Sequence, residues 1–177
     1  MPHRHSIYVL DAGDRVASVN DVWTEFAVHN GAPDLTDRVL GRPVWQFISG
    51  EQTETIYRAL FQRVRTGVTI TLPYRCDAPT RVREFELEMA LQGEGDIVCT
   101  THVIGERDRP AVRLLDSRAE RSGAMLLMCS WCKRVEIGEW VEPEVAVERL
   151  GLFGGGPVPH VTHGICDECL ERLMAQV

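Results

Sequence analysis

The sequence predicts an α+β fold: a five-stranded antiparallel sheet with helices on one face, followed by a smaller second unit near the C-terminus. Two short apolar runs separated by turn residues open the chain, helical periodicity follows, and three strand-like segments come next. This order lets one apolar side of a sheet pack against the helices. The last third of the chain instead carries two Cys-x-x-Cys pairs.

The first 67 residues supply two of the strands and two helices. Residues 6–10 and 15–19 flank the turn at residues 11–14, a pattern that predicts a hairpin. Asn20 is a good N-cap, so we expect a helix over residues 21–29 that stops at Asn30 and Gly31. Residues 51–65 carry an apolar stripe at helical spacing and stop at Gly67, which predicts the clearest helix of the chain.

Three strands follow as a meander. Apolar side chains recur at every second position over residues 68–76. Phe85, Leu87 and Met89 then alternate with three glutamates at positions 84, 86 and 88, which predicts one buried and one solvated face. These carboxylates are therefore expected in water rather than in a catalytic pair. A turn at residues 93–96 leads to the third strand, over residues 97–104.

Several short motifs in this part carry a family resemblance. They are YVLD at residues 8–11, VNDVW at 19–23, VLGRPVWQFI at 39–48, PYRCD at 73–77 and REF at 83–85. Together with the order of the elements, they resemble a PAS domain over residues 6–105. The resemblance implies a sensory or interaction module whose sheet and helices enclose a small pocket for a ligand or partner. It also implies a possible homodimer, with Leu114 and Leu115 as candidate contacts.

Composition limits the functional classes. The 177 residues include 26 acidic and 19 basic side chains, for a net charge of −7, whereas nucleic-acid binding needs a basic surface. No apolar run approaches the roughly 18 residues of a transmembrane helix. Residues 1–5 lack the apolar core of a signal peptide. We therefore expect a cytoplasmic chain that binds neither nucleic acid nor a membrane.

No catalytic or nucleotide-binding motif occurs, so we expect no enzyme. The helix over residues 51–65 has no histidine to ligate haem, and His102 is expected to be a core or edge residue. Cys76 and Cys99 fall on apolar alternations, which favours small buried hydrophobes over sensor thiols. Six aromatic residues belong to the core or line a ligand cavity: Trp23, Trp45, Phe47, Phe61, Tyr74 and Phe85.

The two Cys-x-x-Cys pairs are the strongest signal. Cys129 and Cys132 form the first, and Cys166 and Cys169 form the second. Two such turns supply the tetrahedral shell of four thiolates that Zn²⁺ accepts, so the sequence predicts a closed structural zinc site. The second pair begins a helix over residues 167–175, whose first amides favour thiolates, and another helix is expected over residues 143–150. The arrangement resembles a treble clef or a zinc ribbon.

Alternatives remain at this point. The same four thiolates accept iron, they can act as a redox switch, and an open coordination position would indicate a metalloenzyme. His163 is expected to pack beside the site or hold a ligand in place, although it could replace a cysteine. The motifs around the cysteines, CSWCK and THGIC, resemble a tail found after PAS or receiver domains in bacterial signalling proteins.

These observations combine into one functional hypothesis. A PAS-like sensory domain, residues 1–105, is expected to be joined by a linker, residues 106–123, to a zinc-binding module, residues 124–177. The linker is expected to include a helix or strap near residues 113–121. The chain is predicted to be a non-enzymatic signalling protein that binds a small ligand or a protein partner. In the alternative hypothesis, the cysteine cage is itself the redox or metal sensor.

Overall fold

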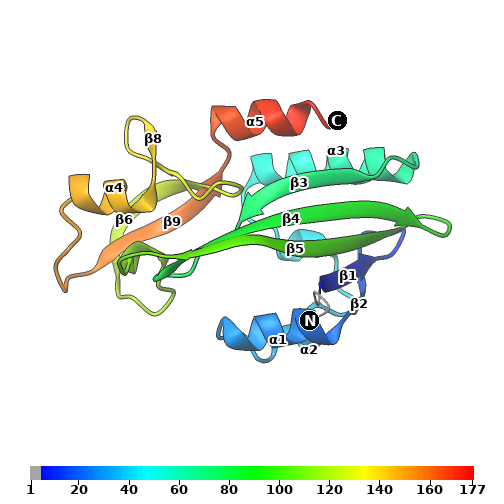
Figure 1. Ribbon diagram of the computed structural model, residues 1–177, viewed down its shortest axis with the longest axis horizontal. Coiled ribbons are helices and arrows are strands. Elements are labelled where there is room, and N and C mark those ends of the chain that lie inside the picture. Colours follow the sequence, from blue (N-terminus) through cyan, green and yellow to red (C-terminus); the bar gives the residue numbers. More distant parts are fainter. Residues whose placement is uncertain (1–4) are drawn as a thin grey trace.

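The computed structural model describes residues 5–177 and contains two sheets that lie one beyond the other (Figure 1). The expectation of no signal peptide falls mainly on residues 1–4, which lie outside the described residues. The first sheet is antiparallel throughout, with strand order β2-β1-β5-β4-β3. Its strands are β1 (Ser6–Leu10), β2 (Val16–Val19), β3 (Ile70–Arg75), β4 (Arg81–Gln92) and β5 (Asp96–Asp108). The predicted five-stranded antiparallel sheet is therefore confirmed.

The helices of this part lie between β2 and β3 in the chain. They are α1 (Asp21–His29), α2 (Leu35–Val39), the 3-10 turn η1 (Val44–Gln46) and α3 (Glu51–Arg65). Asn20 caps α1 as predicted, because its side-chain oxygen accepts a hydrogen bond from the Trp23 amide at 2.9 Å. Helix α2 and the turn η1 were not predicted, since elements of five and three residues show too little periodicity. No helix in residues 5–177 is long and apolar enough to span a membrane.

One face of the sheet packs against α3. Phe85, Leu87 and Met89 of β4 are buried, whereas the three intervening glutamates are not, so the predicted alternation is confirmed. Strand β5 runs further than predicted, to Asp108. Its charged end pairs with the start of β4, and Arg81 forms ion pairs there with Glu106 and Asp108. Charged residues can extend a strand in this way where both faces are exposed to water.

The second sheet was not predicted. Its strands are β6 (Arg121–Cys129), β7 (Val135–Glu136), β8 (Trp140–Val141) and β9 (Val158–Gly164), in the order β8-β7-β6-β9. Strands β6 and β9 are parallel and far apart in sequence. The two expected helices are present as α4 (Pro143–Arg149) and α5 (Asp167–Met174). Figure 1 shows α5 alongside α3 and β3 of the first sheet.

The two parts share a core. Trp131, Ile165 and Leu173 belong to the same buried cluster as Leu60 and Phe61 of α3. A second cluster fills the space between α4 and the second sheet. The C-terminal part therefore packs directly on the first sheet and its helix.

The segment between the sheets contributes to the second cluster. Its only helical part in the described chain is the 3-10 turn η2 (Arg113–Leu115). Leu114 is 1% exposed and packs with Met128 and Val135, so it is not available as the dimer contact expected from sequence. Leu115 is half-buried against the same cluster. The homodimer itself stays a prediction.

Candidate metal centre

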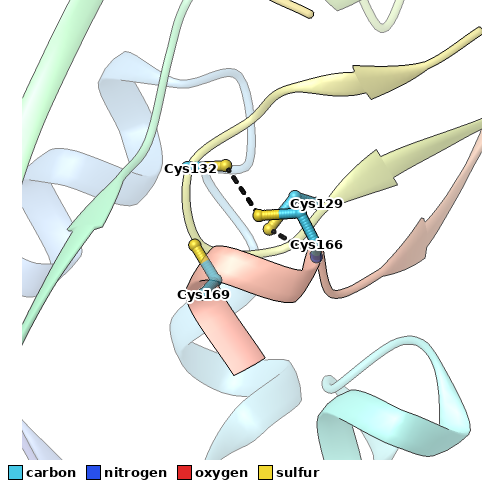
Figure 2. A group of neighbouring side chains, drawn as sticks. All are labelled: Cys129, Cys132, Cys166 and Cys169. Atoms are coloured by element: carbon cyan, nitrogen blue, oxygen red, sulfur yellow. Dashed lines mark hydrogen bonds between the residues drawn. The ribbon is translucent and has the colours of Figure 1, made fainter. Parts of the chain in front are cut away.

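Two parallel strands bring the cysteine pairs together. Strand β6 ends at Cys129, and this residue lies opposite Gly164, the last residue of β9. Because parallel strands end at the same edge of a sheet, the segments that follow β6 and β9 meet there. Cys132 lies in the tight turn after β6, Cys166 is the N-cap of α5, and Cys169 lies in the first turn of that helix (Figure 2).

The four sulfur atoms have the spacing of a metal site. All four Sγ atoms lie within 4.8 Å of one another, and those of Cys132 and Cys166 are 3.6 Å apart. Sulfur atoms roughly 2.3 Å from a tetrahedral ion would be about 3.8 Å apart. A disulfide requires about 2.05 Å, and all six cysteines are free thiols. The four residues therefore fit a single four-coordinate metal ion.

Hydrogen bonds around the cage favour thiolates. The Cys166 amide donates to the Cys129 sulfur at 3.5 Å, and the Arg172 guanidinium donates to the Cys169 sulfur at 3.6 Å. Hydrogen bonds from the Cys132 and Cys169 thiols lower the pKa of Cys129. The hydrogen bond between Cys129 and Cys169 in turn raises the pKa of the Cys169 thiol. These shifts favour ionisation of Cys129 before Cys169. A bound divalent ion would ionise the other thiols as well.

Cations surround this negative charge. Arg134 lies two residues after Cys132 and pairs with Glu168 at 2.6 Å, which raises the pKa of the guanidinium. Lys133 folds back onto the turn, where its Nζ donates to the Ser130 carbonyl oxygen at 2.7 Å. Burial lowers the pKa of this lysine. The basic pair that follows Cys132 in the sequence is therefore placed beside the sulfur atoms.

His163 is not one of the clustered ligand groups. The ligand atoms within 4.8 Å of one another, among the described residues, are the four cysteine sulfurs alone. His163 lies half-buried at the end of β9, and burial with the nearby charge of Lys133 lowers the pKa of its imidazole. Its role beside the cage stays a prediction.

The turn that carries Cys129 and Cys132 is docked on α3. Trp131 is 4% exposed, and its ring stacks on Tyr57 of α3 with 5.2 Å between the centroids. The Trp131 carbonyl oxygen accepts a hydrogen bond of 2.7 Å from the Arg75 amide at the end of β3. Hydroxyl oxygens of Thr53 and Ser130 are 3.0 Å apart. No local pattern predicts these contacts, because their partners are far apart along the chain.

A buried ion network fixes the other side of the module. Asp77, in the loop after β3, is fully buried and pairs with Arg75 and Arg109. Arg75 also contacts Glu142 at 2.8 Å, and Arg109 contacts Glu144 at 3.1 Å. Both glutamates lie at the start of α4. Arg75 of β3 and Arg109, which directly follows β5, thus hold one carboxylate between them and reach α4.

The PAS-like part contains a small aromatic cavity. It has a volume of about 220 Å³ and is lined by Tyr8, Trp23, Phe47 and Tyr57 among others. Tyr74 and Phe85 line a second pocket of about 120 Å³, and Trp23 contributes to both.

The remaining two aromatic candidates belong to the core. Phe61 is 1% exposed, and Trp45 packs against it. The six aromatic candidates are thus divided between cavity walls and core.

The two cysteines outside the cage differ in environment. Cys99 is fully buried in β5, and burial raises the pKa of its thiol to about 12. It acts as a small hydrophobe, as the sequence predicts. Cys76 lies just beyond β3 and is only partly buried, so it is not a core residue. His102 is half-buried in β5, and its ring lies 4.3 Å from that of His5.

Comparison with known proteins identifies similar folds only. No family model matches the chain, and no curated protein does. A solved PAS domain of the Cronobacter turicensis quorum-sensing receptor RpfR, in complex with C12:0, is 16% identical; the match covers 57% of this chain and 94% of that one, with a TM-score of 0.39. The PAS domain of Bordetella pertussis BvgS is 18% identical over 56% of this chain and 72% of that one, with a TM-score of 0.40.

A third similar structure comes from Haloarcula marismortui. It is the PAS domain of an HTR-like protein, 18% identical over 58% of this chain and 89% of that one, with a TM-score of 0.38. These three similar structures are PAS domains. Beyond the five-stranded sheet and its helices, this chain has a C-terminal segment in which four cysteines lie close together.

Proposed function

We propose that the chain is a non-enzymatic signal-transduction protein in which a PAS-like ligand cavity is coupled to a structural zinc module. One observation carries the coupling: Tyr57 lines the aromatic cavity and also stacks on Trp131, which lies between two cage cysteines. A ligand that moves the Tyr57 ring changes the packing of the metal-binding turn. By linkage, loss of metal would alter ligand affinity to the same extent.

Zinc is the metal that the ligand set supports best. Four thiolates fill a tetrahedron and leave no position for substrate, which is typical of structural rather than catalytic zinc. An iron ion would accept the same ligands. Metal analysis of the purified chain should find about one zinc per chain and no visible absorption. Iron with a coloured protein would overturn the choice of zinc, and a metal-free folded protein would overturn the metal site.

A matched pair of variants tests the ligand assignment. Cys132→Ser removes one sulfur from the cage and should lower the bound zinc. Cys76→Ser removes a partly buried thiol outside the cage and should leave the zinc content unchanged. Equal zinc content in both variants would contradict the assignment.

The coupling can be tested with a small apolar probe. Benzene enters apolar cavities of this size class, and the indole N–H resonance of Trp131 reports on the metal-binding turn. We expect benzene to shift this resonance in concert with those of the cavity residues. Trp140, which lies in β8, serves as the internal control and should shift less. Benzene binding with an unmoved Trp131 resonance would refute the coupling.

A redox sensor is the second candidate, and one observation favours it. A pocket of about 220 Å³ opens directly onto the cage and is lined by Cys132 and Cys169. A peroxide that reaches this pocket would oxidise two thiolates to a disulfide, would itself be reduced to water, and would release the metal. Metal release at peroxide doses that leave the first sheet folded would support this function. Metal retained until global unfolding would exclude it.

A further inference from the structure

A further cavity, here called the junction cavity, lies where the loop after β3 meets the second sheet. Its volume is about 460 Å³, about twice that of the aromatic cavity, and it falls within the range of small-molecule sites. Its walls come from the loop after β3, the segment around η2, both parallel strands and the turn of the metal site. A molecule bound there would contact the loop after β3 and, at the same time, the strands and the turn of the metal module.

Two cations line this cavity without a carboxylate partner. Lys133, the only lysine of the chain, and Arg121 form no ion pair within residues 5–177. Arg121 donates to the backbone oxygens of Leu114, Asp116 and Pro159. Lys133 uses one of its three donors, on the Ser130 carbonyl.

The backbone at Lys133 also points to a role for this side chain. Its φ angle is 63°, in the left-handed region that glycine or asparagine usually occupies. Lys133 at this position lines the cavity. Strained positions of this kind cluster at functional sites.

The rest of the cavity completes an environment for an anion. His160 and His163 of β9 both line it and can donate hydrogen bonds. The single lining carboxylate, Asp77, acts electrostatically on Lys133, but it is held between two arginines that offset its charge. Leucine, methionine and valine side chains, with Cys76 and Ser117, form the remaining wall.

We propose that this junction cavity binds a small organic anion, with a carboxylate or phosphate head against Lys133 and Arg121 and an apolar body against the aliphatic wall. Because the ligand would contact the loop after β3 and both parallel strands of the second sheet, it would stabilise the docked arrangement of the metal module. The site is separate from the aromatic cavity of the PAS-like part. It therefore gives the chain a second input.

Calorimetric titration of the full 177-residue chain tests the proposal with three probes of similar shape. Phenyl phosphate and phenylacetate carry the two candidate head groups, and benzyl alcohol is the neutral control. At least one of the two anions should bind. Benzyl alcohol should bind more weakly by about tenfold or more, as expected for loss of a charged hydrogen bond. The preferred anion identifies the head group. Equal binding of all three probes, or no binding of either anion, would overturn the proposal.

Two variants locate the bound anion. Lys133→Met keeps the length of the side chain and removes its charge, so it should weaken anion binding by about tenfold or more. His160 is exposed, so His160→Glu should fold normally and weaken binding by placing a carboxylate at the cavity mouth. Arg118→Gln is the control, since the Arg118 side chain is 89% exposed and lies outside the cavity wall.

Metal content measured on the same samples separates this site from the cage. If Lys133 served only to balance the charge of the cage, Lys133→Met would lower metal affinity and leave anion binding intact. Should Lys133→Met fail to fold, His160→Glu still decides the question. Wild-type anion affinity in His160→Glu would place the anion elsewhere and refute the proposal.

Discussion

Replacement of Trp131 by alanine tests how strongly the metal-binding turn is attached to the PAS-like part. The side chain is 4% exposed and stacks on Tyr57, so nearly all of its surface is removed from water. A buried aromatic side chain removes about 150–250 Å² from water. At ~25 cal/mol per Å², this burial corresponds to about 4–6 kcal/mol. The value is an upper bound, because the unfolded chain already buries part of this surface.

We therefore expect Trp131→Ala to lower the free energy of unfolding by about 3–5 kcal/mol, measured by urea denaturation. Phe153→Ala is the matched control, since Phe153 is 71% exposed and its loss should change stability by less than about 0.5 kcal/mol. The loss of unfolding free energy in Trp131→Phe should lie between those in Trp131→Ala and Phe153→Ala, because phenylalanine keeps a ring against Tyr57. A loss below about 1 kcal/mol in Trp131→Ala, with metal still bound, would refute the idea that this side chain joins the two parts.

Three further predictions concern single positions. Gly50 and Gly31 both have positive φ angles, of 93° and 81°. A Cβ on Gly50 would lie 2.7 Å from a backbone oxygen of β9, whereas a Cβ on Gly31 would meet nothing within 4 Å. In urea denaturation, Gly50→Ala should therefore cost about 1–3 kcal/mol more than Gly31→Ala, and equal costs would contradict this contact. Asp77→Asn removes the buried carboxylate that Arg75 and Arg109 share, and each arginine keeps only its contact with a glutamate at the start of α4. It should cost about 3–5 kcal/mol, against less than about 0.5 kcal/mol for Asp108→Asn, whose side chain is 90% exposed. The pKa of Cys99 is raised from 9.0 to about 12, so its contribution to stability is present below pH 9 and is lost as pH rises toward 12. The unfolding free energy should fall above pH 9 by up to about 1.4 kcal/mol per pH unit from this group, and Cys99→Ala should show a smaller slope; identical slopes would contradict the prediction.

Local patterns in the sequence account for most elements of the first sheet. The bounds of β1, α1 and α3 agree with those predicted, because each has clear periodicity and a capping or stop residue. Charged strand ends were harder to predict. Strand β5 continues to Asp108 because its partner strand offers arginines, which cannot be deduced from β5 alone.

At the candidate metal site, too, local spacing was predictive, whereas pairing between distant segments was not. The spacing of the four cysteines alone indicated a common ion, and the structure brings their sulfur atoms within 4.8 Å. The parallel pairing of β6 with β9 could not be foreseen, since the two strands are separated by a hairpin, a helix and a glycine-rich loop. The burial of Leu114 within the second cluster was missed for a similar reason.

The sequence by itself determined which residues can bind metal, where the longer helices and strands form, and which face of β4 is buried. These properties depend on side-chain chemistry and on spacings of a few residues. Only the tertiary structure decided that Trp131 stacks on Tyr57, that Asp77 lies between two arginines, and that Lys133 and Arg121 line one cavity. Such contacts join segments distant along the chain, and the packing of the whole core selects them.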